Sequence, residues 1–587
     1  MTRSRYAFDP ARHEVVLREL ICAIEGRETL PRADLEELLR RHPKEGRGFF
    51  SKAEIIQGFR HLRAGRLSPG AERIFLDKIR MKPVRTQSGV TPVTVLTKPF
   101  PCPGQCIFCP SDVRMPKSYL SDEPGAQRAA QHQFDPYLQT LSRLTTYHNT
   151  GHPCDKVELI ILGGTWSSYA DEYQIWFVQR CFEALNAFGR IRQGWRPQAA
   201  SPRVDFRHLT QRVDGLSMTS RYNEIVTRFA GEDDDAESST WLDLEQVQRE
   251  NENAAARCVG LVVETRPDNV APNEIERLRR LGTTKVQIGV QSLSDRVLEL
   301  NHRGHDVATT RRAFRLLRLA GFKIHAHWMP NLYGSDPAAD IEDFQRLFDD
   351  RDFRPDELKI YPCSLIESAE LMAYHADGRW RPYDHDELLE VVTTCLLATP
   401  EYCRVTRVIR DIPGTDIVTG NKLTNFRQIA EKALAAGNRR PRDIRSREIG
   451  QDPVAREDLE LRESTFESSI GREIFLQYVT EDDRLAAFLR LALPDSPATI
   501  EEIDGSAMIR EVHTYGRLVA FGERPQGRSQ HLGLGRSLIA HATDRAAAAG
   551  YPDLAVISSV GTRQYYRRLG FADGPLYQHL PLPLATR

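Results

Sequence analysis

Three closely spaced cysteines constrain this chain more than any other feature. Cys102, Cys106 and Cys109 stand in the spacing C-x3-C-x2-C, and no further Cys or His follows within 20 residues. Soft thiolates select iron–sulfur clusters, zinc or copper(I), and this spacing lets three of them reach one metal centre. A closed structural zinc site usually takes four ligands. The spacing therefore favours a [4Fe–4S] cluster with one open iron, and a structural or partner-completed zinc site is the alternative.

Length and composition indicate a multidomain globular protein. The chain has 587 residues, 40% hydrophobic residues and a mean hydropathy of −0.46. It contains no run of 18 apolar residues, and its first residues lack an apolar signal region. We therefore expect a cytoplasmic protein without a membrane segment. The seven cysteines outside the cluster are scattered within apolar runs, as expected of buried thiols in a reducing compartment.

The N-terminal segment is basic. Residues 1–85 carry 19 Lys and Arg against 12 Asp and Glu, and apolar periodicity predicts helices over residues 10–80. A basic helical domain suggests contact with a nucleic-acid backbone. A solvated helix surface explains the same charge equally well, so charge alone leaves the two open.

From residue 93 the pattern changes to short β-branched runs that alternate with longer helical stretches. This alternation predicts a parallel sheet built from βα units, and six units fit a partial barrel. The six predicted strands are Val93–Leu96, Val157–Leu162, Val259–Val263, Val286–Val290, Ile324–Trp328 and Leu358–Tyr361.

Polar or glycine-rich motifs follow the predicted strands, where βα barrels build their active sites. Lys98 and the cysteine run follow the first strand, Gly163-Gly164 the second, Glu264 ends the third and Gln291 the fourth. A tight turn is the alternative for the glycine pair. Residues 185–257 interrupt the pattern between the second and third strands. Their acidic run suggests a surface loop.

The last 130 residues form a second α/β pattern after a basic, linker-like stretch at 400–455. Strands at Phe488–Leu493, Met508–Val512 and Leu554–Ile557 accompany a glycine-containing loop that opens a helix. Such a helix start favours a pyrophosphate. The residues of this loop are Gln530, His531, Leu532, Gly533, Leu534 and Gly535.

Four side chains in this part are candidates for catalysis. Glu511 and His513 share one face of a predicted strand and could act as a general base or an orienting group. A surface Glu and a half-buried His are the equally plausible alternative. Tyr565 and Tyr566 point about 100° apart on a helix, so one can pack while the other faces a ligand.

Several stretches together resemble one family, the catalytic subunit of Elongator, in its single-subunit prokaryotic form. The stretches are Arg85–Pro99, Arg257–Asp268, Leu358–Pro362, Arg410–Pro413, Ile509–His513 and Val556–Gly570. The resemblance implies a helical tRNA-binding domain (1–85), a radical S-adenosylmethionine (SAM) partial barrel (86–400), a basic linker (401–455) and a GNAT acetyltransferase-like domain (456–587). The fold class is thus α/β and multidomain.

The resemblance also implies a reaction. Cys102, Cys106 and Cys109 would hold a [4Fe–4S] cluster that reduces SAM, and the resulting radical would activate acetyl-CoA to attack C5 of the tRNA wobble uridine. The product would be 5-carboxymethyluridine. The anticodon stem-loop would lie on the basic N-terminal domain and linker. The residues expected to contact acetyl-CoA are Lys156, Glu511, Val512, His513, Thr514, Gln530–Gly535 and Tyr566.

The chain departs from the family pattern at 441–450, where members often carry a cysteine-rich zinc site. This stretch contains no cysteine, so we expect no zinc and ion pairs of Arg445 or Arg447 with Glu448 instead. Two other functions compete with the first: a protein N-acetyltransferase with a structural iron–sulfur domain, and a tRNA-binding scaffold. The sequence leaves dimerisation open.

Overall fold

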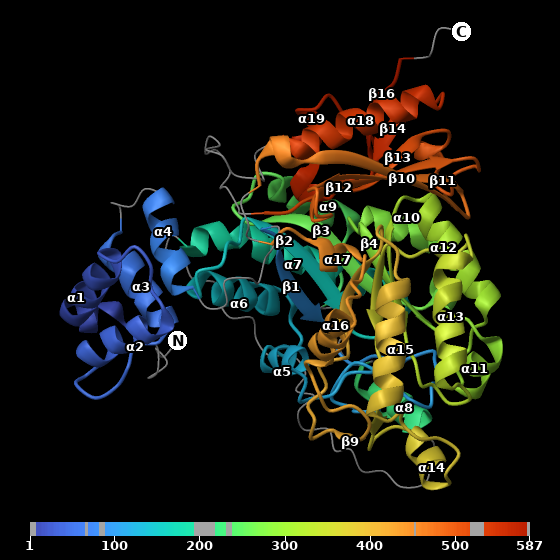
Figure 1. The fold of residues 1–587 in the computed structure, drawn as a ribbon, viewed down its shortest axis with the longest axis horizontal. Helices are drawn as coiled ribbons and strands as arrows, with labels where there is room; N and C mark the ends of the chain where they lie inside the picture. The colour runs from blue at the N-terminus through green and yellow to red at the C-terminus, as the bar shows by residue number, and fades with distance from the viewer. Residues whose placement is uncertain are drawn as a thin grey trace. The chain divides into compact units, whose positions relative to one another are not determined.

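The computed structural model describes residues 8–64, 69–80, 89–192, 218–230, 237–450, 454–516 and 533–583. The chain divides into two compact units (Figure 1). Residues 1–91 and 141–156 form the first unit, and residues 92–140 and 157–587 form the second. In the described part of the chain, no helix has both the length and the apolar composition needed to cross a bilayer.

The first unit is helical, as predicted. Its described helices are η1 (Pro10–His13), α1 (Glu14–Glu25), α2 (Arg32–Arg41), α3 (Lys52–Leu62), α4 (Pro69–Ile79) and the end of α6 (Pro136–Asn149). The α-helices turn apolar residues inward, and Leu17, Ile55 and Phe59 are fully buried. Gly58 permits close packing of α3 on α1, because a Cβ there would lie 2.8 Å from Cδ1 of Leu17.

The second unit contains the partial barrel. Within the described residues its sheet has the order β1-β2-β3-β4-β5-β6-β8, and the strands from β3 to β8 pair in parallel. All six predicted strands are present, within a few residues of their predicted bounds. The strands are β1 (Thr91–Leu96), β2 (Lys156–Leu162), β3 (Arg257–Thr265), β4 (Lys285–Gln291), β5 (Lys323–Trp328), β6 (Glu357–Ile360) and β8 (Arg404–Val408).

The seventh strand, β8, comes from the stretch that the sequence pattern suggested was a linker. It pairs with β6 through Glu357–Arg404 and Ile360–Val408. The same stretch supplies β9 (Ile417–Thr419), which pairs with β7 (Leu365–Ile366), and the helices α16 (Phe426–Ala436) and α17 (Ile444–Arg447). Residues 404–447 are therefore an ordered part of the barrel layer (Figure 1).

Helices and short turns connect the barrel strands. The helices are α5 (Pro124–Gln131), α7 (Asp171–Arg192), α8 (Met218–Ala230), α9 (Trp241–Asn251), α10 (Pro272–Arg280), α11 (Asp295–Leu300), α12 (Val307–Leu319), α13 (Pro337–Asp349), α14 (Leu371–Ala376) and α15 (His385–Ala398). The 3-10 turns are η2 (Trp166–Ser168) and η5 (Pro267–Asn269). Side-chain N-caps fix several helix starts, for example Asp306 before α12 and Asp384 before α15.

The second unit also contains a second sheet. Its described strands follow the order β10-β11-β12-β13-β14-β16-β15, with β13 and β14 parallel and the other paired strands antiparallel. The strands are β10 (Glu460–Ser468), β11 (Gly471–Val479), β12 (Leu485–Pro494), β13 (Ala507–Thr514), β14 (Asp553–Val556), β15 (Ala572–Asp573) and β16 (Gln578–Pro581); the helical segments are η6 (Arg456–Asp458), η7 (Glu501–Ile503), α18 (Leu534–Ala548), η9 (Val560–Thr562) and α19 (Arg563–Arg567).

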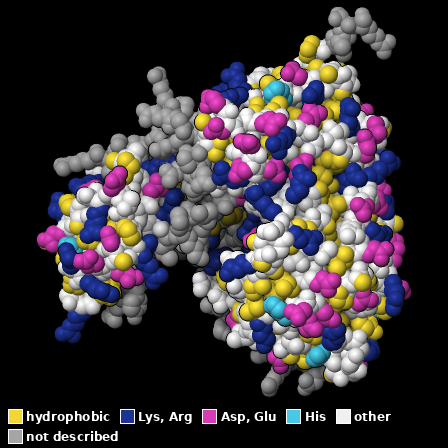
Figure 2. Space-filling model, viewed as in Figure 1, with side chains coloured by type: hydrophobic (Ala, Val, Ile, Leu, Met, Phe, Trp, Pro, Cys, Tyr) yellow, Lys and Arg dark blue, Asp and Glu magenta, His cyan; other side chains and the backbone are white. Residues whose placement is uncertain are grey.

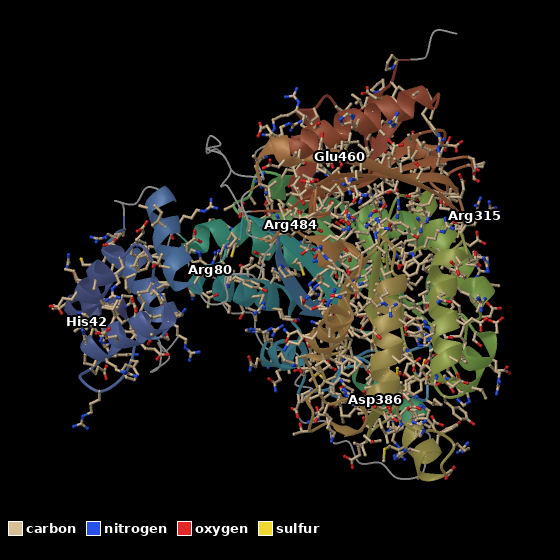
Figure 3. All side chains as sticks on the ribbon, in the orientation of Figure 1. His42, Arg80, Arg315, Asp386, Glu460 and Arg484 are labelled. Atoms are coloured by element: carbon tan, nitrogen blue, oxygen red, sulfur yellow. The ribbon has the colours of Figure 1, made fainter. Side chains whose placement is uncertain are left out.

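The second sheet contacts the amino-terminal ends of the barrel strands. The contact is built from buried charges: Arg510 on β13 bonds Asp356 just before β6 and also Glu473 on β11 (2.9 Å). Arg318 on α12 bonds the same Glu473 at 3.0 Å. Arg315, also on α12, donates to the carbonyl of Ser469 (Figure 3). Because these groups compensate one another away from water, the barrel and the second sheet share one interior.

Candidate functional site

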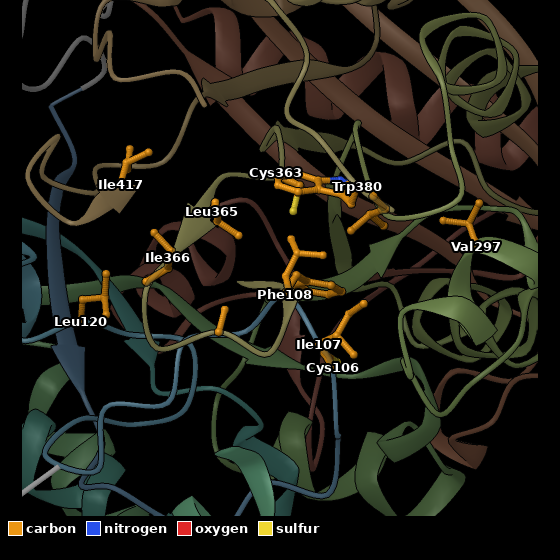
Figure 4. Close-up of a cluster of buried hydrophobic side chains, with 13 residues drawn as sticks. Cys106, Ile107, Phe108, Leu120, Val297, Cys363, Leu365, Ile366, Trp380 and Ile417 are labelled. Carbon is orange, nitrogen blue, oxygen red and sulfur yellow. The ribbon is translucent and has the colours of Figure 1, made fainter. Parts of the chain in front are cut away.

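The cysteine loop follows β1 at the carboxyl-terminal edge of the barrel sheet. Its apolar residues anchor it in a separate core, where Ile107 and Phe108 pack with Cys363, Leu365 and Trp380 (Figure 4). Backbone bonds continue this attachment, since Ile107 accepts from Leu371 and donates to Asn301. The loop therefore projects three thiols from a firmly packed base.

Two arginines that sequence analysis did not single out face Cys106. Arg303, after α11, places Nη1 3.4 Å from Sγ of Cys106, and Arg266, after β3, approaches the same sulfur at 4.0 Å. Arg266 also lies against Gly104, where a Cβ would collide with the guanidinium. A hydrogen bond from Cys109 and the charges of both arginines hold the pKa of Cys106 well below its usual value. They favour the thiolate, the form that binds iron.

The three thiols have the donor chemistry of an iron–sulfur site. They stand on one loop, and soft thiolates are the ligands that such clusters take. Within the described residues, no group of three His, Cys, Asp or Glu side chains is arranged to hold a metal ion. Cys106 is buried while Cys102 and Cys109 are half-buried, and Sγ of Cys109 lies 3.2 Å from the Ser118 hydroxyl.

The glycine pair after β2 has a packing role beside the cysteine loop. Gly163 and Gly164 have φ angles of 149° and 92°, which L side chains rarely adopt. A Cβ at Gly163 would collide with the Thr97 side chain, and one at Gly164 would lie 3.2 Å from the carbonyl oxygen of Lys117. The backbone bends at both glycines. These bends bring it against both ends of the cysteine loop.

The other rim residues have specific partners. Lys98 forms a 2.6 Å ion pair with Glu237. Glu264 accepts a hydrogen bond from the Tyr119 hydroxyl at 2.7 Å. Gln291 has a φ of 68°, and its buried Oε1 has no hydrogen-bond partner among the described residues. A donor from outside the described chain could satisfy this oxygen.

Burial also changes the acid–base chemistry of the barrel interior. Lys359 on β6 is enclosed there and donates to Oε1 of Gln287, which also lies 3.0 Å from Nε2 of His327. Burial lowers the pKa of Lys359 to about 7, although the Glu264 carboxylate opposes the shift. Burial likewise lowers the pKa of His327 well below its usual value. Sequence analysis quoted Lys359 within a motif but assigned it no role.

The second sheet opens between β13 and β14. Their parallel pairing ends at Ile509 and Val556, while β13 continues to Thr514. Beside this opening, a Cβ at Gly535 would lie 3.8 Å from Thr514, 3.9 Å from Val512 and 3.1 Å from the Tyr565 hydroxyl. The structure thus brings together three of the residues predicted to contact a ligand and the catalytic candidate Tyr565, at the start of α18.

Glu511 and His513 share a face of β13, as predicted, but that face is turned away from Gly535. Glu511 pairs with Lys323 on β5 and with Arg490 at 2.9 Å. Burial raises the pKa of Glu511, but these cations outweigh it and leave the value below normal. His513 stacks on Phe488 at 5.6 Å, and burial lowers its pKa to about 4. Its imidazole is therefore neutral at pH 7.

The remaining predicted ligand contacts fall in different places. Tyr566 is buried and packs edge-on against Phe571, so it serves as a core residue, while Tyr565 stays half-buried. Gly533 precedes α18 with a φ of 70°. Lys156 begins β2 in the first unit. Gln530, His531 and Leu532 lie outside the described residues.

Several known proteins are similar to this chain in sequence. The Radical SAM superfamily model matches residues 201–347, and the Radical SAM C-terminal domain model matches residues 355–436. The chain is 35% identical over 555 residues to the tRNA uridine(34) acetyltransferase of Methanocaldococcus jannaschii, and the match covers 91% of each chain. It is 31% identical to Elongator complex protein 3 of Homo sapiens, covering 86% of this chain and 87% of that protein. The chain belongs to the Elongator protein 3 family.

A solved structure of the Elongator protein 3 family supports the same conclusion. The archaeal Methanocaldococcus infernus Elp3 with an N-terminal deletion superposes with a TM-score of 0.66 at 34% identity. The match covers 85% of this chain and all of that chain. The expected fold class, with its radical SAM partial barrel and its C-terminal α/β sheet, is confirmed.

Most basic residues of the first unit are already paired. Carboxylates of the same unit hold Arg41, Lys44, Arg60 and Arg63, and Figure 2 shows the two charges interspersed over this surface. Arg80 pairs with Asp77 (Figure 3). Among the described residues, the exposed Arg40 and Arg47 form no such ion pair. Charge counting could not separate paired from unpaired groups, because the partners are set by the fold.

The segment at 441–450 differs from the prediction in its ion pairs. Glu448 binds Arg404 on β8 at 2.8 Å. Arg447 instead reaches Asp483 at 3.1 Å, and Arg445 donates to the carbonyl of Thr406. The predicted pairing of Arg445 or Arg447 with Glu448 is therefore wrong, because β8 brings a third arginine closer to that carboxylate.

Proposed function

We propose that this chain carboxymethylates C5 of the tRNA wobble uridine, using acetyl-CoA as the carbon donor and SAM as the radical source. One observation carries the proposal. The second compact unit contains both the three-cysteine loop, at the rim of the barrel, and the second sheet, which opens beside the glycine-containing start of α18. The names of the relatives point the same way, since three of them are tRNA uridine(34) acetyltransferases.

Cys102, Cys106 and Cys109 would hold a [4Fe–4S] cluster. When bound and reduced, such a cluster supplies the electron that splits SAM into methionine and a 5′-deoxyadenosyl radical. The chain's own contribution is electrostatic and steric. The hydrogen bond from Cys109 and the charges of Arg303 and Arg266 favour the thiolate form of Cys106. Gly163, Gly164, Glu264, Gln291 and Lys98 would line the SAM side of the rim.

The opening between β13 and β14 would bind acetyl-CoA. Backbone N–H groups at the start of α18, a helix of 15 residues, attract the pyrophosphate. Val512, Thr514 and Tyr565 surround the same point. Gln530–Leu532, Lys156 and Tyr566 belong to the proposal through the family resemblance alone. The anticodon stem-loop would contact the first unit, where Arg40 and Arg47 remain available for phosphates.

Zinc has no part in this proposal. Residues 441–450 carry no cysteine, and their carboxylates are engaged with arginines. We expect the purified chain to contain far less than one zinc per molecule, measured by elemental mass spectrometry.

The test is an anaerobic reaction with tRNA, SAM, acetyl-CoA and a reductant. Mass spectrometry of the digested nucleosides should show 5-carboxymethyluridine, and Cys106→Ser should abolish it. If a fully loaded enzyme gives no modified uridine, the proposal fails. If 5-carboxymethyluridine still forms in Cys106→Ser, the cluster is not required and the proposal fails as well.

Protein N-acetylation is the less favoured alternative. A GNAT enzyme needs a base to deprotonate the amine, and Glu511 is occupied by two cations. Incubation with acetyl-CoA and a lysine peptide in the absence of SAM separates the two activities, since only the alternative predicts an acetylated peptide.

A further inference from the structure

The long insertion between β2 and β3 contacts the cysteine loop. Sequence analysis suggested that residues 185–257 form a surface loop. In the structure, the described part of this segment includes α8 and α9. α9 packs on α7, whereas α8 lies against the residues that follow Cys102. The insertion therefore contributes to the candidate cluster site.

Asn223 on α8 binds both backbone groups of Cys102. The Cys102 N–H donates to Oδ1 of Asn223 at 3.0 Å, and Nδ2 of Asn223 donates to the Cys102 carbonyl at 2.9 Å. One side-chain amide thus replaces a strand partner for a residue that lies in neither a helix nor a strand. Two bonds at one residue restrict its orientation, and with it the direction of the thiol.

Tyr222 fixes α8 in place. Its side chain is fully buried, and its hydroxyl donates to the carbonyl of Met115 at 2.8 Å. The ring packs beside Val113 and Val226 and lies 5.0 Å from Nζ of Lys117. Neighbouring residues of one helix therefore bind the cysteine loop at two points, Cys102 and Met115. A helix held this way has little freedom to release Cys102.

A second contact from the insertion reaches the residue before the loop. Glu237 pairs with Lys98, and both side chains are nearly buried, at 15% and 11% exposed. Nζ of Lys98 also lies 5.2 Å from the centre of the Tyr173 ring. This contact does not involve α8, and it lies at the amino-terminal end of residues 98–115. Together the insertion's contacts hold residues 98–115 at three points: Lys98, Cys102 and Met115.

We propose that Asn223 is a positioning residue for Cys102, so that the insertion preorganises the first thiol of the cluster site. The inference rests on the cluster assigned to these cysteines in the proposed function. Preorganisation matters because a ligand that must be ordered during binding lowers affinity. Cys106 and Cys109 do not need this help, since a backbone bond joins them and the apolar core anchors their loop.

The experiment compares the full-length Asn223→Ala variant with wild type and with Thr227→Ala, an exposed position on the same helix. In the metal-free proteins, iodoacetamide alkylation is followed for each cysteine by peptide mass spectrometry. We expect Cys102 to react about tenfold faster in Asn223→Ala, as the loss of two hydrogen bonds predicts. Cys106, Cys109 and the circular dichroism spectrum should stay unchanged, and Thr227→Ala should match wild type.

Reconstitution with iron and sulfide supplies the second readout. Asn223→Ala should lose its cluster absorbance several-fold faster than wild type when challenged with a chelator, and the electron paramagnetic resonance signal of its reduced cluster should change. Equal Cys102 alkylation and equal cluster loss in the variant and wild type would overturn the inference. An equal change at all three cysteines would also overturn it, because that indicates general loosening.

Asn223→Asp guards against a variant that fails to fold. It retains an acceptor for the Cys102 N–H but loses the donor, so its alkylation rate should fall between wild type and Asn223→Ala. A rate equal to that of wild type would contradict the inference. If wild type itself binds no cluster, the proposed function fails. The alkylation comparison, made without metal, would still decide the role of Asn223.

Discussion

Glu511 illustrates how the surroundings of one residue decide its role. A carboxylate near the end of a strand beside a ligand opening resembles a general base. In the fold it lies between Lys323 and Arg490, with its side chain 9% exposed. A base that already neutralises two cations accepts a proton poorly. We therefore interpret Glu511 as a link between the second sheet and β5.

Glu511→Gln tests this interpretation. The variant leaves Lys323 and Arg490 with less compensation, although Lys323 still faces Glu357 at 3.5 Å. We expect a loss of about 2–3 kcal/mol in the free energy of unfolding, somewhat below the cost of a fully orphaned buried charge. Urea denaturation measures it, and Lys323→Met combined with Glu511→Gln should recover part of the loss. Unchanged stability with lost acetyl-CoA turnover would instead identify a catalytic base.

His579 should make stability depend on pH. Hydrogen bonds to Asp553 at 2.7 Å and Glu502 at 3.2 Å raise its pKa from 6.5 to about 9. A raised pKa means that the folded protein holds the proton more tightly. This contribution is complete below pH 6.5 and is lost as the pH rises through 9.

The measurement is the melting temperature between pH 6 and pH 10. Wild type should lose more stability than His579→Gln over this range, because the variant has no proton to release. Parallel curves for the two proteins would show that His579 carries no such contribution.

At this scale the sequence predicted the thiols but not their neighbours. Local spacing identified Cys102, Cys106 and Cys109, because those residues lie on one loop. Arg303 lies 197 residues from Cys106, and Asn223 lies 121 residues from Cys102. Only the closing of the barrel brings such residues together, and a single sequence carries no local signal of it.

Among the elements, most strands with buried apolar faces were predicted, whereas strands with charged faces were not. β11 is an exception, because it is largely buried and was also missed. The barrel strands β1 to β6 are rich in buried β-branched residues. β8 (RVTRV) carries two arginines within five residues, and β10 (ELRESTFES) is largely exposed at the sheet edge. The polar residues of both strands obscured the alternating pattern of a strand. β8 pairs at a boundary rich in charged residues, and β10 faces water.

The connection between α2 and α3 provides an element-scale prediction for tRNA binding. Arg40, near the end of α2, and Arg47, within this connection, are exposed without ion pairs among the described residues, so they can neutralise phosphates at little cost. Arg40→Glu combined with Arg47→Glu should weaken tRNA binding at least tenfold and reduce its salt dependence. Filter binding across several salt concentrations measures both effects.

The matched control is Arg63→Glu, which removes a cation that already pairs with Glu25. It should affect tRNA binding less than the double variant does. An equal loss in the control would mean that overall charge, rather than the unpaired arginines, governs binding.

For the whole molecule, buried charges join the barrel and the second sheet into one cooperative unit. Arg510→Met would leave Asp356 and Glu473 without their shared cation, at a cost of about 3–5 kcal/mol. The second sheet contains no tryptophan, because all six lie at or before Trp380, so tryptophan fluorescence does not report that sheet directly. We expect the fluorescence midpoint in urea to fall although the substitution lies outside the barrel. An unchanged midpoint would show that the two parts unfold independently.

The placement of the second sheet sets a distance that any coupled reaction must cover. Glu511, near the opening of that sheet, touches Lys323 at the first residue of β5, whereas the cysteine loop lies at the edge where β5 ends. A strand rises about 3.3 Å per residue, so the five steps between the first and last of the six residues of β5 span roughly 17 Å. A reaction that joins the two sites therefore requires either a carrier long enough to span this distance or a movement of the same size. The length of β5 thus sets the minimum reach of a carrier between the opening and the cysteine loop.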